Sequence, residues 1–385
     1  MIVVIADDLT GAAEIGGLAL KYGLTAEITT TVSNIASAKA DLLIIDTDTR
    51  SLSRAAAEKV TADVCAALQA LQPVLLFKKI DSVLRGHVLA EIQVQQNLLQ
   101  LPRALIVPAN PGLGRTVRNG TYFLHGQPLH QSSFARDPEF PVLTSQVQEL
   151  LQDKEGAIQV LPHYAPLPGA GIVVGEVQDS THLQAWSKKA DAQTLVAGAA
   201  EFFAALLETR NIQPVTTEKN SAALRTPTLM VCGSAFHKSR AFVKKMEEDG
   251  FPVSYMPAAL CTAAANEELF GRWMEDTLLR LNRDSKVSIA VHPDMEENSL
   301  QALHIRNKMA EAAAFIAEHT ALQEILIEGG STAAAVIRKL GIDKLYPTAA
   351  LAPGVTRMRV QGEKELHLTL KPGSYAWPPL YLFPL

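Results

Sequence analysis

The run Ile2-Val3-Val4-Ile5-Ala6-Asp7-Asp8-Leu9-Thr10-Gly11 joins an apolar strand pattern to the polar start of a helix. Its branched apolar residues predict a buried β-strand over residues 2–5, and a helix is expected from about Thr10 to Lys21. A strand followed at once by a helix is the first half of a βαβ unit. The two carboxylates between them therefore lie beyond the carboxyl end of a strand, where open α/β sheets bind ligands.

The same alternation of short apolar runs and helical patterns continues along the chain. In the first half it predicts strands at 42–45, 74–77, 104–107, 172–174 and 195–196, and helices at 55–71, 87–99 and 201–207. Asn119-Gly120 predicts a hairpin turn and hence a short antiparallel excursion. A second series has strands at 229–231, 253–256, 288–291 and 325–327, a helix at 307–318, and a strand at 366–370 that ends the sheet.

These elements predict an α/β protein of two domains, each a mostly parallel sheet flanked by helices, with a cleft between them. The segment between the two series is polar, has no hydrophobic period and contains prolines. We therefore expect a first domain over residues 1–210, a linker over 211–227 and a second domain over 228–385.

Composition excludes several classes of protein. The net charge is −5 without a basic stripe, which argues against a nucleic-acid partner. Cys65, Cys232 and Cys261 are too far apart in sequence to form a disulfide framework or a Cys-x-x-Cys metal pattern, so we expect no metal ligands of this kind and a cytoplasmic location. No apolar run is long enough for a membrane span, and no basic leader precedes residues 2–5. The dinucleotide fingerprint is missing, which argues against a nicotinamide-dependent dehydrogenase.

Charged groups follow successive strands of the first half. One of Asp7 and Asp8 suffices to cap the helix, which leaves the other to accept a hydrogen bond or a proton from a substrate hydroxyl. Arg50 suits a carboxylate, although a solvated loop arginine is an equal alternative. The run from Lys78 to Arg85 mixes cations, a carboxylate and a hydroxyl, which suits an acidic polyol or else a surface ion-pair cluster. Arg115 follows the fourth strand, where a structural turn explains it equally well.

Glycines and hydroxyls take the place of charges in the second half. Glu328-Gly329-Gly330-Ser331-Thr332 follows a strand and opens a helix that Ser331 and Thr332 are expected to cap. The backbone amides of such a turn favour anions, and the glycines let a ligand come close. The pattern is not a Walker loop, and a capped helix without any ligand is the alternative.

Several of these segments together resemble the four-carbon acid sugar kinases, which act on threonate, erythronate and 3-oxo-tetronate. The resemblance covers nearly the whole chain in the same order, and its most specific parts are residues 5–12 and the run Lys79-Ile80-Asp81-Ser82-Val83-Leu84-Arg85-Gly86. The other matching segments are 47–50, 108–116, 134–138, 329–333 and 353–355.

The resemblance implies a sugar-acid domain followed by a nucleotide domain, with the magnesium complex of ATP as the phosphoryl donor and a small sugar acid as the acceptor. The sequence does not fix the oligomeric state, and a homo-oligomer stays open. The substrate residues that it implies are Asp7, Asp8, Arg50, Lys79, Ile80, Asp81, Ser82 and Arg85. The nucleotide residues that it implies are Ser234, Gly329, Gly330, Ser331, Thr332, Gly354, Lys371, Gly373 and Ser374. An aspartate orients or deprotonates the accepting hydroxyl; Asp8 is the first candidate and Asp81 the second.

The chain departs from the family pattern in its second half. Ser331 stands where the family has a glutamate, Cys232-Gly233-Ser234-Ala235-Phe236 replaces a Ser-Gly-Ser-x-Ser turn, and residues 371–376 differ from the usual Lys-x-Gly-x-Phe-Gly. Two hypotheses follow from this pattern. The chain is an ATP-dependent sugar-acid kinase, or it is a sugar-acid-binding sensor that has lost catalysis.

Overall fold

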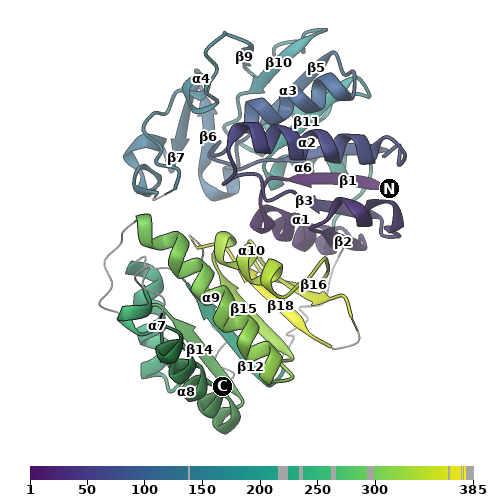
Figure 1. Cartoon of the computed structure of the whole chain (residues 1–385). Helices are drawn as coiled ribbons and strands as arrows, with labels where there is room; N and C mark the ends of the chain where they lie inside the picture. The colour runs from purple at the N-terminus through teal and green to yellow at the C-terminus, as the bar shows by residue number, and fades with distance from the viewer. Residues whose placement is uncertain are drawn as a thin grey trace. The chain divides into compact units, whose positions relative to one another are not determined.

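The structure is a computed structural model of the 385-residue chain. It describes residues 1–137, 139–215, 224–233, 237–261, 266–292, 299–362, 365–373, 375, 377 and 378. The contacts divide the chain into two compact units, Met1–Thr216 (unit 1) and Thr217–Leu385 (unit 2), and each unit has its own set of strands and its own core (Figure 1).

Unit 1 contains a parallel sheet with the strand order β2-β3-β1-β4-β11-β5-β10-β9. Its inner strands are almost entirely buried, as expected for a parallel sheet that is covered on both faces. The strands are β1 (Ile2–Ala6), β2 (Ala26–Thr29), β3 (Leu42–Asp46), β4 (Leu75–Lys79), β5 (Arg103–Val107), β9 (Ile158–Leu161), β10 (Gly171–Gly175) and β11 (Thr194–Gly198).

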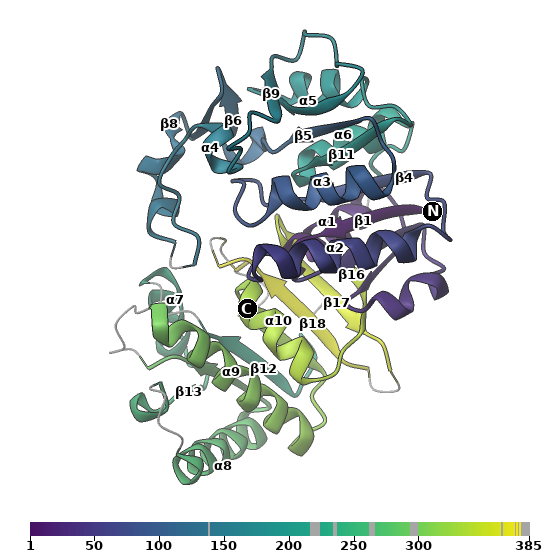
Figure 2. The same cartoon turned by 45° about the horizontal axis from the view of Figure 1, so that its top comes forward.

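Helices cover both faces of this sheet. The helices are α1 (Leu9–Lys21), α2 (Arg54–Leu68), α3 (Val88–Leu98), α4 (Val147–Leu150), α5 (Ser180–Ser187) and α6 (Ala200–Thr209). Helices α2 and α3 pack on each other, whereas α1 packs on α6 and α6 on α5 (Figure 2). With right-handed crossovers, α1 leaves β1 toward one face while α2 and α3 leave the neighbouring β3 and β4 toward the other. The chain therefore diverges at the carboxyl end of β1, which is the position where doubly wound sheets bind ligands.

A small antiparallel sheet follows β5. The turn Asn119-Gly120 joins β6 (Arg115–Arg118) to β7 (Thr121–Leu124), and β8 (Gln127–Pro128) pairs with β7. The predicted hairpin is thereby confirmed.

Unit 2 has a mostly parallel sheet with the order β13-β14-β12-β15-β18-β17-β16. Its strands are β12 (Thr228–Cys232), β13 (Val253–Tyr255), β14 (Lys286–Ala290), β15 (Glu324–Glu328), β16 (Lys344–Ala352), β17 (Val355–Val360) and β18 (His367–Lys371). Only the pairs β16–β17 and β17–β18 are antiparallel among the described strands of this sheet. Its helices are α7 (His237–Glu248), α8 (Glu267–Asp284), α9 (Ser299–His319) and α10 (Gly330–Lys339).

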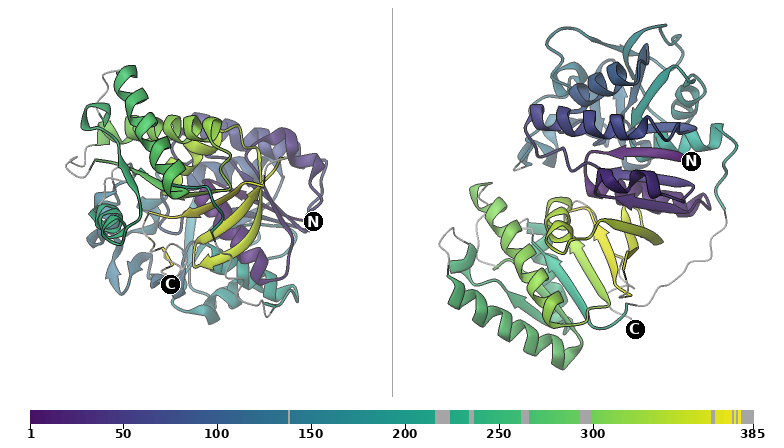
Figure 3. Two further views of the ribbon diagram at one scale, coloured as in Figure 1. Left: turned by 90° about the horizontal axis from the view of Figure 1, so that it is seen from below. Right: turned by 45° about the vertical axis from the view of Figure 1, so that its right-hand side comes forward.

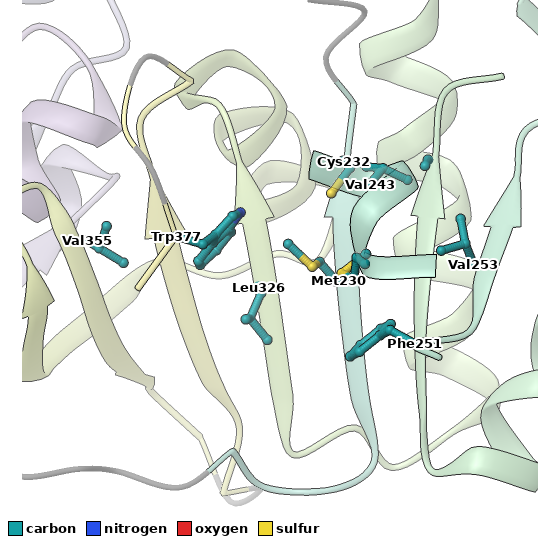
Figure 4. Packing of buried hydrophobic residues seen from close by; sticks show 10 residues of the cluster. Met230, Cys232, Val243, Phe251, Val253, Leu326, Val355 and Trp377 are labelled. Carbon is teal, nitrogen blue, oxygen red and sulfur yellow. The ribbon is translucent and has the colours of Figure 1, made fainter. Parts of the chain in front are cut away.

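Helix α9 packs on both α8 and α10 (Figure 3). A separate core cluster joins α7 to the sheet: it contains Val243, Met230 and Leu326, and Trp377 lies between Leu326 and Val355 (Figure 4). The α/β class is therefore confirmed, with mostly parallel strands flanked by helices in each unit.

Two sequence-based expectations differ from this fold. The strand predicted at 366–370 does not end the sheet, because β18 lies between β15 and β17 and all its residues are buried. Residues 211–215 were expected to begin a linker, but Val215 donates a backbone hydrogen bond to Lys21 at 2.9 Å and contacts Gly23, so this segment stays attached to unit 1. No helix among the described residues is both long enough and apolar enough to cross a membrane.

Candidate functional site

Asp8 combines a structural role with an accessible carboxylate. It is the N-cap of α1, and its Oδ1 accepts a hydrogen bond from the Gly11 amide at 2.9 Å. This bond satisfies one of the amides that the first turn of a helix leaves unpaired. One carboxylate of the Asp7-Asp8 pair therefore serves as the cap, as the sequence predicted.

Arg50 gathers the neighbouring carboxylates. Its Nε and Nη2 donate to Asp7 at 2.8 and 2.9 Å, and its Nη1 donates to Asp8 at 2.8 Å. The same Nη1 lies 3.9 Å from Oδ1 of Asp81. We call these four residues, Asp7, Asp8, Arg50 and Asp81, the carboxylate cluster. The arginine that the sequence offered for a substrate carboxylate is bidentate on the protein's own Asp7.

The turn after β4 is held by a second ion-paired arginine. Arg85 donates from Nε and Nη2 to Asp81, both at 2.8 Å, and from Nη1 to Asp137 at 2.7 Å. The backbone amide of Arg85 also donates to Asp81. Both oxygens of Asp81 therefore accept hydrogen bonds from Arg85, and these bonds hold the turn after β4.

The other predicted residues of this turn contribute in different ways. Lys79 is buried, donates to the Ile80 carbonyl at 3.1 Å and lies 3.3 Å from Glu14 of α1. Ile80 is fully buried, so its side chain packs in the core. Ser82 accepts a hydrogen bond from Nη1 of Arg115 on its hydroxyl and another from the Tyr122 hydroxyl on its carbonyl.

The surroundings of Asp8 and Asp81 shift the pKa values of these two carboxyls in opposite directions. Burial raises the pKa of Asp8 above its ordinary value; Asp7 adds to this effect, while Arg50 and Lys79 oppose it. Burial also acts to raise the pKa of Asp81, but the guanidinium groups of Arg85 and Arg50 outweigh it and hold that pKa far below its usual range. A pair of carboxyls separated in this way is typical of sites that divide acid–base roles.

Lys79 keeps its positive charge beside these acids. Burial acts to lower its pKa, but Glu14, Asp8 and Asp7 together raise it. The ammonium therefore balances part of the negative charge at the carboxyl end of β1.

In unit 2, α10 begins differently from the prediction. The N-cap is Gly329, with φ 93° and no side-chain hydrogen bond, whereas Ser331 and Thr332 lie inside the first turn of the helix. The expectation that these two hydroxyls cap the helix is therefore wrong, because the chain already turns at the glycine. The first turn also contains no acidic residue, so its amides form a positively polarised end.

The predicted Lys371 is turned away from solvent beneath this helix end. It is buried, lies 3.5 Å from Glu328, and donates to the carbonyls of Pro372 and Tyr375 at 2.9 and 2.7 Å. Its carbonyl accepts a hydrogen bond from the Gly329 amide at 2.9 Å. Lys371 thus ties β18 to the turn that precedes α10.

Gly354 completes this edge of the unit 2 sheet. A Cβ at Gly354 would lie 2.3 Å from the Tyr375 ring, so only glycine lets the β16–β17 turn approach the segment after β18. Gly330 lies in the first turn of α10, and Gly373 is exposed in the turn after β18. Ser234 and Ser374 lie outside the described residues.

Two family models of known proteins match successive parts of the chain. Residues 2–240 match the family model described as a sugar-binding N-terminal domain, and residues 229–375 match the one described as a nucleotide-binding C-terminal domain. The chain belongs to the four-carbon acid sugar kinase family.

Relatives in this kinase family carry named activities. The chain is 26% identical over 387 residues to a D-threonate kinase of Salmonella typhimurium, covering 91% of this chain and 89% of the relative. It is 31% identical over 181 residues to a D-erythronate kinase of Heliobacterium modesticaldum, covering 45% and 40%. It is 24% identical over 410 residues to a 3-oxo-tetronate kinase of Brucella melitensis, covering 97% and 92%.

Solved structures show the same fold over the whole chain. A Salmonella typhimurium LT2 protein described as a putative tRNA synthase has a TM-score of 0.78 at 20% identity and covers 97% of this chain and 96% of its own. A Haemophilus influenzae protein has a TM-score of 0.70 at 21% identity, with 97% of each chain covered. At these identities the likeness establishes the fold and nothing further.

Three residues that pair with the predicted site residues were not among the site residues predicted from the sequence. Glu14, Asp137 and Glu328 each pair with a predicted cation: Lys79, Arg85 and Lys371 respectively. Glu328 carried a usable signal, since it is the last residue of β15 and directly precedes Gly329. Asp137 lies in the matching segment 134–138, but its pairing with Arg85, 52 residues away, could not be read from the sequence.

Proposed function

We propose that the chain is an ATP-dependent kinase that phosphorylates a hydroxyl of a four-carbon sugar acid such as threonate, erythronate or 3-oxo-tetronate. Unit 1 would bind the acid at the turns after β1, β3 and β4. Unit 2 would bind the magnesium complex of ATP at the start of α10. The family membership and the named relatives support this assignment.

The observation that carries the proposal is the position of Asp8 within the carboxylate cluster. Its side chain is 16% exposed, against 5% for Asp7 and 9% for Asp81. Both oxygens of Asp7 and of Asp81 accept hydrogen bonds from an arginine, whereas Asp8 receives one bond from Arg50 and one from its own helix. Asp8 is thus the acid of the cluster best placed to accept a proton from a substrate hydroxyl.

The raised pKa of Asp8 supports the same role. A general base works best when its pKa approaches the operating pH, because it then accepts a proton more readily and still remains ionised. Asp81 is unsuited to this task because its lowered pKa makes it a weak base. We therefore assign Asp8 as the base and Asp81, with Arg50 and Arg85, as positioning residues.

The start of α10 suits the phosphates of the nucleotide. Its N-terminal amides carry no side-chain cap, and no acidic side chain of its first turn opposes an anion. Gly329 and Gly330 also leave room for a phosphate to approach the backbone. Lys371 and Glu328 would hold this turn in place, since both are buried and paired.

The test is ADP release in a coupled assay with saturating ATP and Mg²⁺ and a panel of four-carbon acids. We expect at least one acid to stimulate ADP release well above the rate without acceptor. Calorimetry with each acid and with an ATP analogue accompanies the assay. If an acid binds but no nucleotide binds and no ADP is released, the chain is a binding protein and the kinase proposal is wrong.

A further inference from the structure

Arg50, Arg85 and Arg115 lie in the segments that follow β3, β4 and β5, and the first two have the same guanidinium edge occupied. Nε and Nη2 of Arg50 donate to the Asp7 carboxylate, and Nε and Nη2 of Arg85 donate to the Asp81 carboxylate. This edge has two parallel N–H groups, so it can bind a carboxylate bidentately. Neither arginine therefore has it available for the carboxylate of a substrate.

Arg115 differs from them at this edge. Its Nη1 donates to the Ser82 hydroxyl, and its Cζ lies 5.5 Å from the centroid of the Phe134 ring. Its Nε is buried and has no hydrogen-bond partner among the described residues, and no bond from its Nη2 to any of them is formed. Arg115 thus presents the carboxylate-binding edge while its other end is held by Ser82 and Phe134.

Asn110 provides an unsatisfied acceptor beside Arg115. It is 4% exposed, and its Oδ1 is buried without a hydrogen-bond donor among the described residues. Asn110 and Arg115 exchange both backbone hydrogen bonds, at 2.9 and 3.0 Å, as an antiparallel bridge. Residues directly opposite each other in such a pair place their side chains on the same face.

Two unpaired polar groups on one face require an explanation. A buried donor or acceptor left without a partner costs about 1–3 kcal/mol, so folded proteins keep few of them. Here one group is a donor edge of fixed positive charge and the other is a neutral acceptor. A ligand that satisfies both carries an anionic acceptor next to a hydroxyl donor, which is the chemistry of a 2-hydroxy acid.

We propose that Arg115 binds the carboxylate of the sugar acid and that Asn110 accepts a hydrogen bond from the adjacent 2-hydroxyl. This inference rests on the proposed function and names the residues that select an acid over a neutral polyol. The pair is continuous with the carboxylate cluster, because Ser82 holds Arg115 and directly follows Asp81, which Arg50 approaches to 3.9 Å. The sequence analysis predicted that Arg50 would bind the substrate carboxylate. In this proposal Arg50 instead holds Asp7 and Asp8 in place.

The experiment measures acid binding by calorimetry without nucleotide, so that it does not depend on turnover. The wild-type protein, Arg115→Met and Arg115→Lys are titrated with threonate and erythronate and with the matching tetritols, which lack the carboxylate. Arg118→Met is the matched control, because Arg118 lies on the same strand but is exposed and stacks on Phe123.

We expect Arg115→Met to weaken binding of the acid by at least about 30-fold, since it removes the partner of a partly buried charge. Binding of the tetritol should change less than about threefold, which also shows that the variant is folded. Arg115→Lys should recover part of the affinity, because it restores the charge but not the two-pronged geometry. Arg118→Met should behave like the wild type.

A companion variant tests the second contact. Asn110→Ala should weaken binding of the 2-hydroxy acids by about 5–30-fold but leave the affinity for 3,4-dihydroxybutanoate, which lacks the 2-hydroxyl, nearly unchanged.

Equal losses of affinity for acid and tetritol in Arg115→Met, or unchanged acid binding, would overturn the inference while the kinase proposal stands. Acid binding that depends on Arg115 without any ADP release would overturn the kinase proposal instead. Absence of acid binding to the wild type would overturn both.

Discussion

Asp8 both caps α1 and carries the most exposed carboxylate of the cluster, so a variant has to separate these roles. Asn caps helices as well as Asp does, which means that Asp8→Asn should keep the bond from Gly11 and the fold. It removes the base, and we expect kcat to fall by about 10²–10⁴-fold in the coupled assay, with a thermal unfolding midpoint close to that of the wild type.

A matched control for Asp8→Asn exists in the same unit. Asp179 is the N-cap of α5 and accepts hydrogen bonds from the amides of Thr181 and His182. Asp179→Asn makes the same chemical change at another helix start and should leave turnover unaltered. Turnover of Asp8→Asn within threefold of the wild type would contradict the assignment of Asp8 as the base.

Asp46 gives a residue-scale prediction on pH. It is buried at the end of β3, and burial, with Asp48 and Asp8 adding to it, raises its pKa well above the ordinary value. A raised carboxyl pKa means that the folded state binds the proton more tightly than the unfolded state, so stability falls as pH rises through the interval between the two values. Asp46→Asn should therefore be more stable than the wild type at pH 8, by on the order of 1–3 kcal/mol, and this advantage should shrink as the pH is lowered.

Urea unfolding between pH 4 and pH 8 measures this difference. Asp41 is a control of opposite sign, because hydrogen bonds from Thr25 lower its pKa. Its stabilising contribution is present above the unfolded-state pKa and is lost as pH falls through the folded-state pKa. Asp41→Asn should thus be less stable than the wild type at pH 8. A stability gain of Asp46→Asn that did not vary with pH would contradict the charge argument.

Single-residue roles were predictable where the relevant neighbours are local in sequence. Asp8 accepts its capping hydrogen bond from an amide only three residues away, and the Asp7-Asp8 pair directly follows a strand. The position of this pair could therefore be derived from the sequence. The hydrogen-bond partners of the arginines could not be derived in this way. Arg50 binds Asp7, which is 43 residues away in sequence, and Arg115 binds Ser82, which is 33 residues away. Whether a guanidinium is already paired depends on such distant contacts, which a single sequence does not display.

At the scale of elements, the turn before α10 depends on the backbone of one glycine. Gly329 has φ 93°, a conformation that costs other residues about 1–3 kcal/mol, although a Cβ there would meet nothing closer than the Thr332 hydroxyl at 3.9 Å. Gly329→Ala should therefore distort the helix start without a clash. We expect the KM for ATP to rise by about 10-fold, with a smaller effect on the KM for the acid.

The other end of α10 provides the control for this variant. Gly341 also has a positive φ, 63°, and a Cβ there would meet nothing within 4 Å. Gly341→Ala should lose comparable stability but keep the KM for ATP, because it leaves the first turn untouched. Equal KM values in both variants would show that stability alone, and not the phosphate turn, had changed.

Elements were predictable where they are apolar and short. The buried strands β1, β3, β4, β5, β12 and β15 stand out as branched apolar runs. Helices α7 and α8 were not predicted, since each presents a charged outer face that hides its few buried positions. The β16–β17 pair was also missed because its strands alternate irregularly around register shifts, and this is why β18 was placed at the edge.

At the scale of the whole molecule, the two units carry different chemistry at the carboxyl edges of their sheets. In unit 1 the turns after β1, β3 and β4 contain ion-paired carboxylates and arginines. In unit 2 the turn after β15 offers backbone amides and glycine, and the buried Lys371 at the end of β18 is already paired to Glu328. We therefore expect a hydroxy acid to bind to unit 1 and a polyphosphate to bind to unit 2.

Hydrogen exchange with each ligand alone tests this division of binding. The sugar acid should slow amide exchange in residues 7–10, 47–50 and 80–86 of unit 1, because it would add a bridge between turns that the carboxylate cluster already brings together. The magnesium complex of ADP should slow exchange in residues 329–333 of unit 2, where the amides at the start of α10 would donate to phosphate oxygens. Helix α8, which packs on β13, β14 and α9 within unit 2, is the internal reference. Protection of residues 7–10 by the nucleotide alone, with none at 329–333, would reverse the assignment of the two units, and with it the identification of Asp8 as the base that meets the sugar hydroxyl.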